Sequence, residues 1–343
     1  MATPTRFARS APGSHGLPAL AVTLPQFRDG PGPALDALAE SWRLGFAGGF
    51  LFDHLWPLGG QRHRPALECW TLLAGLAARL RDLTEGAAGP REAGPDDQPD
   101  RGPALPGGSP AGAGNAGWDD RFRLGTLVTR AGLRPPALLA RMAATVAQVA
   151  GSPLVVGVGA GDHLNRDEND AFGLPYRDAA GRAADLERAA LALRGPLAGR
   201  VRPPELWIGG TGPRARTAAG RFADAWNGWG LAPGELAAGL ADVREHAERA
   251  GRDPGSVTAT WGGQVLIGED AAAARAMLAS WSPGRPPPEL ARTVAGGPET
   301  VAARLAELGA AGATWCVVSL VGGPGPELRR RLASCLGFDT ESL

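Results

Sequence analysis

An acid and an imidazole follow directly after an apolar run near residue 50. Phe50, Leu51 and Phe52 have the pattern of a strand core, and Asp53 and His54 stand at its end. Enzymes move protons with carboxylate and imidazole groups, and α/β folds place their chemistry at the carboxyl ends of parallel strands. A helix-capping aspartate followed by a packed histidine would have the same sequence. The other strand ends must decide between these interpretations.

Two glycine-rich turns follow later strands of the chain. Their backbone N–H groups could form an anion pocket for a phosphate, and Pro213 opens a helix aimed at the second turn. Glycines that merely make tight turns would give the same pattern. A dinucleotide-binding fingerprint is not favoured at either turn. Gly157–Asp162 has Asp162 where the fingerprint requires Gly or Ala. Gly210–Ala215 fits the spacing, but no acid ends the strand that follows it. The turn residues are Gly157, Gly159, Gly161, Asp162, Asn165, Gly209, Gly210, Thr211 and Gly212.

Strands and helices alternate along nearly the whole chain. Eight repeats of strand and then helix are typical of a (β/α)8 barrel, although an open doubly wound sheet has a similar pattern. A barrel brings the residues after each strand to one face. The strands are expected near residues 20, 50, 124, 156, 207, 226, 262 and 317, and the helices over 32–44, 65–83, 135–150, 185–194, 213–225, 233–250, 271–281, 298–308 and 327–336.

The sequence predicts one folded domain over 18–343, preceded by a flexible arm over 1–17. Residues 85–117, between the second helix and the third strand, are rich in Gly, Pro and Ala with almost no large apolar side chains. Such a segment buries too little surface to offset its ordering entropy, so we expect a disordered insertion. A lid over the site is the alternative interpretation.

Composition excludes several classes of function. Acidic and basic residues number 35 each, which argues against a global basic footprint for nucleic acid. All the basic residues are arginine, so neither a lysine Schiff base nor a lysine phosphate clamp can exist. No apolar run reaches about 18 residues, and no signal segment is evident, so we expect a cytoplasmic protein without a membrane span. His54 and His163 with Asp53 and Asp162 could mimic a metal site, but the early His-x-His of barrel hydrolases is absent and no metal is predicted.

Seven short motifs, in their order and spacing, resemble the luciferase-like (β/α)8 flavin and deazaflavin oxidoreductases. The resemblance is to the branch that depends on coenzyme F420, and it covers nearly the whole chain. The motifs lie at 53–55, 65–71, 124–129, 136–140, 156–161, 171–175 and 207–214.

This resemblance implies a role for each strand end. Asp53 would contact the deazaflavin ring, and His54 would be the acid/base residue beside the reacting carbon. A bulge with a cis peptide at Leu127–Val128 would support the back of the ring. Asp162 takes the place of a catalytic glutamate in the related sugar-phosphate dehydrogenases. The coenzyme's side chain and phosphate would be held by Ala160, Gly161, Asn165, Gly209, Gly210 and Gly212.

We therefore expect F420-dependent hydride transfer to or from a small organic substrate. Relatives are commonly homodimers, and the sequence leaves the oligomeric state open. A sugar phosphate is not expected, because the chain has no lysine and the segment between Tyr176 and Pro203 is short. Trp56 also lies closer to His54 than the family's ring-stacking tryptophan does. The alternatives are an FMN-dependent monooxygenase of the same fold and a non-catalytic cofactor-binding barrel.

Overall fold

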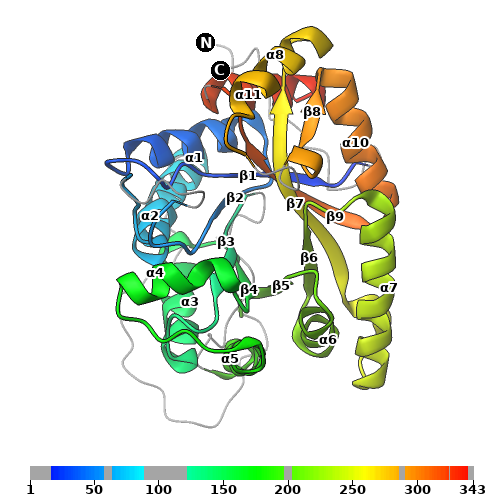
Figure 1. The fold of residues 1–343 in the computed structure, drawn as a ribbon. Helices are drawn as coiled ribbons and strands as arrows, with labels where there is room; N and C mark the ends of the chain where they lie inside the picture. Colours follow the sequence, from blue (N-terminus) through cyan, green and yellow to red (C-terminus); the bar gives the residue numbers. More distant parts are fainter. Residues whose placement is uncertain are drawn as a thin grey trace.

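A closed parallel barrel with helices on its outside forms the molecule (Figure 1). The computed structural model describes residues 17–57, 64–88, 122–196, 203–285, 290–323 and 325–338. β1 pairs with both β2 and β9, and β7 pairs with both β6 and β9, which closes the ring. The barrel strands are β1 (Ala19–Thr23), β2 (Gly48–Leu51), β3 (Arg123–Arg130), β4 (Leu154–Gly159), β5 (Glu205–Gly209), β6 (Ala225–Trp229), β7 (Thr258–Ile267) and β9 (Ala313–Leu320).

The predicted (β/α)8 barrel is therefore confirmed, and each expected strand is present. A ninth strand, β8 (Val294–Gly296), pairs with the end of β7 and was not predicted from the sequence. The helices that cover the barrel are α1 (Gly32–Leu44), α2 (Cys69–Ala88), α3 (Pro136–Ala150), α5 (Ala179–Arg194), α6 (Pro213–Phe222), α7 (Pro233–Arg249), α8 (Ala271–Trp281), α10 (Pro298–Ala310) and α11 (Gly325–Cys335).

The interior of the barrel is filled by large aromatic side chains. Phe50 stacks on Trp207 with ring centroids 5.3 Å apart, and Trp315 meets Trp207 edge-on at 5.7 Å. A Cβ at Gly125 would come within 2.6 Å of the Phe50 ring, so glycine there makes room for the aromatic layer. The interior of the barrel is thus a packed core that supports the strand ends.

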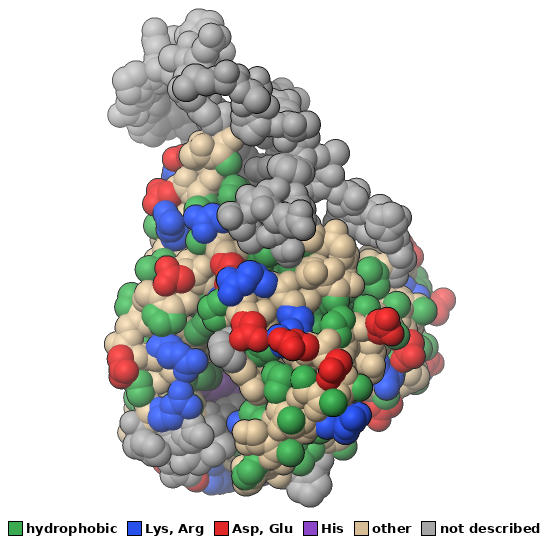
Figure 2. Space-filling view, turned by 90° about the horizontal axis from the view of Figure 1, so that it is seen from above, with side chains coloured by type: hydrophobic (Ala, Val, Ile, Leu, Met, Phe, Trp, Pro, Cys, Tyr) green, Lys and Arg blue, Asp and Glu red, His purple; other side chains and the backbone are tan. Residues whose placement is uncertain are grey.

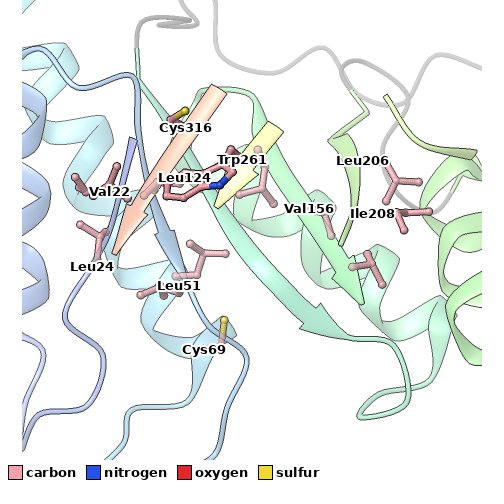
Figure 3. Packing of buried hydrophobic residues seen from close by; sticks show 14 of the residues in the cluster. Val22, Leu24, Leu51, Cys69, Leu124, Val156, Leu206, Ile208, Trp261 and Cys316 are labelled. Atoms are coloured by element: carbon pink, nitrogen blue, oxygen red, sulfur yellow. The ribbon is translucent and has the colours of Figure 1, made fainter. Parts of the chain in front are cut away.

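A second apolar layer lies between the strands and the helices, because strands covered on both faces are apolar on both. Figure 3 shows part of it, with Val22, Leu51 and Leu124 on neighbouring strands. The outer surface is mixed in charge: Figure 2 shows acidic and basic side chains interspersed over one face. In the described part of the chain, no helix has the length and apolarity to cross a membrane.

Several boundaries differ from expectation for local reasons. The Glu68 carboxylate accepts hydrogen bonds from the N–H groups of Trp70 and Thr71, so α2 begins at Cys69 rather than at residue 65. α2 also runs through Ala88, so residues 85–88 are helical and do not belong to an insertion. The remaining insertion residues, 89–117, and the arm residues 1–16 lie outside the described residues.

The segment after β4 holds two helices that the sequence pattern does not predict. These are the short 3-10 helix η1 (His163–Asn165) and α4 (Arg166–Ala171). α5 begins at Ala179, earlier than the expected residue 185, because Asp178 caps it by accepting from Gly181 N–H. Together these elements build one wall of the site.

Candidate functional site

His54 is paired with a buried carboxylate that sequence reasoning missed. His54 follows β2, and its Nδ1 lies 3.2 Å from Oε2 of Glu168 on α4. The histidine side chain is 16% exposed, whereas that of Glu168 is fully buried. Glu168 also accepts hydrogen bonds from the N–H groups of Leu55 and Trp56. The N–H bonds hold the Glu168 carboxylate, which in turn holds the His54 ring at Nδ1. Within the described residues, no hydrogen bond involves Nε2.

The ionised form of Glu168 is stabilised by its surroundings. Burial raises the pKa of Glu168, but the hydrogen bond and charge of His54, the Arg130 guanidinium and the Leu55 N–H outweigh burial and hold the pKa below its ordinary value. Arg130 Nη2 lies 3.1 Å from Oε2 of Glu168. Burial lowers the pKa of Arg130 itself. An ionised carboxylate on Nδ1 favours a ring that can take up a proton at Nε2.

The carboxylate of Asp53 points into a buried polar cluster. Arg134 makes two bonds to it, with Nη1 2.6 Å from Oδ2 and Nη2 3.1 Å from Oδ1. Thr129 Oγ1 donates to Oδ2, and the same hydroxyl accepts from Trp70 Nε1 at 3.0 Å. Arg130 Nε donates to the Asp53 carbonyl at 3.1 Å. Asp53 therefore braces the segment that carries His54, and its expected contact with a coenzyme ring stays a prediction.

β3 contains the irregularity expected in its middle. The Leu127–Val128 peptide is cis, and the pairing register with β4 shifts between Thr126 and Thr129. These two features confirm the predicted bulge and cis peptide, and the expected support of a coenzyme ring by Leu127 and Val128 stays a prediction. The Val128 side chain lies over glycines of β4 and β5: a Cβ at Gly159 or Gly209 would come within 2.5 or 2.7 Å of it. Packing alone therefore accounts for glycine at these two positions.

The turn after β5 has the features of an anion cradle. Gly210 has a φ of +131°, which disfavours other residues there, and Gly212 is the N-cap of α6. No side chain caps α6, and a Cβ at Gly212 would meet nothing within 4 Å. Open space before uncapped N–H groups at a helix N-terminus fits a phosphate group, such as flavin and deazaflavin coenzymes carry.

The turn after β4 is held by a local capping arrangement. Asp162 Oδ1 accepts from Leu164 N–H at 2.9 Å, and Asn165 Oδ1 accepts from Asp162 N–H at 2.8 Å. Gly161 has a φ of +71°, and a Cβ there would be 2.7 Å from Asn165 Oδ1. Asp162 is exposed, and no contact joins it to His54 among the described residues. Its catalytic role stays a prediction.

Glu168, Arg130 and Arg134 were absent from the sequence-based site. Glu168 lies within Arg-Asp-Glu-Asn-Asp, a polar run that looks solvated when read alone. The available signal was its position three residues after Asn165, which places it on the same helical face if the turn continues as a helix. In the described residues no group of His, Cys, Asp and Glu could hold a metal ion.

Comparison with known proteins identifies the family to which the chain belongs. The profile of the luciferase-like monooxygenases matches residues 109–294, more than half of the chain. A phthiodiolone/phenolphthiodiolone dimycocerosates ketoreductase of Mycobacterium tuberculosis (strain H37Rv) is 33% identical over 164 residues, which are 41% of this chain. The match spans only 42% of the ketoreductase's own length.

Solved structures resemble the chain over almost its full length. The coenzyme F420-dependent tetrahydromethanopterin reductase of Methanopyrus kandleri has a TM-score of 0.64 at 16% identity, covering 94% of this chain and 100% of that one. A riboflavin lyase with modified FMN has a TM-score of 0.63 at 14% identity, covering 94% of each chain. At these identities the structures show a shared fold. The family match shows that the chain belongs to the luciferase-like monooxygenase family, whose members are oxidoreductases, as its motifs predicted.

Proposed function

We propose that this protein catalyses hydride transfer between coenzyme F420 and a small organic substrate, with His54 as the acid/base residue. The observation that carries the proposal is the His54–Glu168 pair at the end of β2. A half-buried imidazole, held at Nδ1 by an ionised carboxylate, is suited to exchange a proton at Nε2. The F420-dependent reductase among the structural neighbours supports the choice of coenzyme by analogy of fold.

In this proposal a bound deazaflavin supplies or accepts the hydride, and the chain's own residues do the rest. The turn from Gly209 to Gly212 holds the phosphate at the N-terminus of α6. Leu127 and Val128 support the ring, and Asp53 keeps the His54 segment in place through Arg130 and Arg134. Glu168 orients His54, which exchanges the proton that accompanies the hydride.

Other groups of the site have supporting roles. Trp56 and Phe172, whose rings meet at 6.0 Å, form an apolar rim that limits water. Asp162, at the exposed turn after β4, is the second candidate for proton exchange. Ala160, Gly161 and Asn165 would contact the coenzyme's side chain.

Replacing His54 tests its role. We expect His54→Ala to lower kcat by about 10²–10⁴-fold and to remove one limb of the pH–rate profile. The dissociation constant of F420, measured by fluorescence titration, should stay close to that of the wild type. Wild-type turnover in the variant would show that His54 does not exchange the proton.

An FMN-dependent monooxygenase is the second candidate, and the FMN-containing lyase among the structural neighbours favours it. A deazaflavin has carbon in place of the flavin's N5, and without that nitrogen it cannot activate oxygen as flavins do, so the coenzyme decides the reaction. Titration of the purified protein with each coenzyme separates the two candidates. Tight binding of reduced FMN with oxygen uptake would overturn the F420 proposal, and coenzyme binding without turnover on any substrate would indicate a non-catalytic barrel.

A further inference from the structure

A polar pocket lies between the turn after β4 and the start of α5, and Arg130, the partner of Glu168, is part of its lining. Its lining includes Gly161, Asn165, Tyr176, Arg177 and Arg182. The pocket is narrow, about 30 Å³, which leaves room for about two water molecules or for a carboxylate group and excludes a ring. Arg182 and Arg177 take no part in the mechanism above.

Tyr176, the only tyrosine of the chain, lines this pocket, and two guanidinium groups lie against its ring. The Arg166 guanidinium lies 4.5 Å from the centre of its ring, and that of Arg182 lies 5.1 Å away. The phenol oxygen accepts from Arg182 Nη1 at 2.8 Å and donates to the Asp162 carbonyl at 3.2 Å. Arg182 Nη1 also donates to the Arg177 carbonyl at 2.9 Å. The phenol and a carbonyl thus fix the Arg182 guanidinium without neutralising its charge.

The arginines at the pocket differ in whether a carboxylate pairs with them. Arg130 is paired with Glu168, and Arg177 lies 3.4 Å from Asp185. Neither Arg166 nor Arg182 has an ion pair within the described residues.

The carboxylates nearest to the pocket already have other partners. Asp185 also pairs with Arg188, and the Oδ1 atoms of Asp162 and Asp178 accept from backbone N–H groups. The Nε of Arg182 is buried and has no hydrogen-bond partner. A guanidinium held in place with unused donors is a strong site for a carboxylate or phosphate.

We propose that this pocket binds one anionic group, a carboxylate or a phosphate, of an extended ligand whose reacting part lies at His54. The inference rests on the proposed function and deepens it. Ala160, Gly161 and Asn165 line the pocket and are also the residues proposed to contact the coenzyme's side chain. The anion therefore comes either from the acidic side chain of the coenzyme or from the substrate. Arg182 in the lining contacts it, and Arg166 on the Tyr176 ring adds positive charge beside the pocket.

Arg166→Gln, Arg182→Gln and the double variant test the site directly. Isothermal titration of the full chain with inorganic phosphate and with glutarate measures anion binding without any coenzyme. We expect the double variant to bind at least one of the two anions at least about tenfold more weakly than the wild type, because the charge-assisted contact to Arg182 and the neighbouring charge of Arg166 are lost. Arg182→Lys keeps the charge but not the planar fork, so it should lose less. Arg249→Gln, at an exposed ion pair on α7, is the control and should bind like the wild type.

Ligand titrations then identify the source of the anion. If the coenzyme supplies it, the double variant raises the dissociation constant of F420 about tenfold, and binding of the same deazaflavin without phosphate and acidic tail is unchanged. If the substrate supplies it, F420 binding is unchanged and KM rises for anionic substrates only. Binding of phosphate and glutarate that is equal in wild type and double variant, or absent from both, would overturn the inference. Failure of the wild type to bind F420 would instead contradict the proposed function, and the anion titrations would still test the pocket.

Discussion

Glu168 couples the acid stability of the protein to its candidate site. Its pKa in the folded state lies below the ordinary value of 4.5, so the ionised carboxylate stabilises the fold above that pH. This contribution is lost as the pH falls through the lowered pKa. We expect the free energy of unfolding to fall more steeply in the wild type than in Glu168→Gln between about pH 6 and pH 3. Urea titrations across this range measure both curves, and parallel curves would contradict the assignment.

Asp53 carries a buried charge, and its ion pair with Arg134 offsets the cost of burying that charge. Asp53 is fully buried, and the Arg134 side chain is 14% exposed. Arg134→Met leaves the Asp53 carboxylate without its bidentate guanidinium, which should lower the free energy of unfolding by about 3–5 kcal/mol. Adding Asp53→Asn should recover part of the loss. Arg81→Gln breaks an exposed pair on α2 and should leave the free energy of unfolding close to that of the wild type. Equal losses from Arg134→Met and Arg81→Gln would show that burial does not decide the cost.

At the scale of single elements, the packing of β3 against β5 depends on the Val128 side chain. A Cβ at Gly209 would lie 2.7 Å from Cγ1 of Val128, so Gly209→Ala should destabilise the barrel by about 1–3 kcal/mol. Combining it with Val128→Ala removes the clash, and a double-mutant cycle should give a coupling of at least about 1 kcal/mol. Gly75→Ala, at an exposed position of α2 with open space, should stabilise by about 0.5–1 kcal/mol. Additive effects of Gly209→Ala and Val128→Ala would contradict the packing explanation.

Sequence patterns predict the regular elements well and the wall of the site poorly. The apolar runs of β4 and β7 and the proline-opened helices are local signals, so their positions follow from a few adjacent residues. α4 is short and strongly polar, with no apolar stripe to reveal it. Its one decisive residue, Glu168, is buried only because His54 and Arg130 lie opposite. A partner 114 positions away leaves no periodic signal in a single sequence.

At the scale of the whole molecule, alternation of strands and helices predicts the barrel, but closure depends on contacts between the two ends of the chain. β1 and β9 pair from Ala19–Trp315 to Val22–Val318. The helices that cover this seam, α1 and α11, pack side by side. The paired residues lie near opposite ends of the sequence, so no local pattern reports the seam.

Glu40 of α1 joins this seam to α11 through two arginines that differ in burial. Arg329 is 5% exposed, and its Nε lies 2.7 Å from Oε2 of Glu40. The Arg330 side chain is 54% exposed and lies 2.8 Å from Oε1. Glu40→Gln leaves the Arg329 guanidinium buried without a counterion, so we expect a loss of about 3 kcal/mol in the free energy of unfolding.

Arg330→Gln tests the exposed contact alone. It removes the arginine whose ion pair with Glu40 is screened by solvent, and it leaves the buried pair of Arg329 and Glu40 in place. It should cost less than about 1 kcal/mol. Urea unfolding followed by tryptophan fluorescence and by far-ultraviolet circular dichroism measures both variants. The two probes should give coincident transitions if the seam unfolds with the whole barrel. An earlier fluorescence or dichroism transition in Glu40→Gln alone would show that the first and last helices separate before the barrel opens.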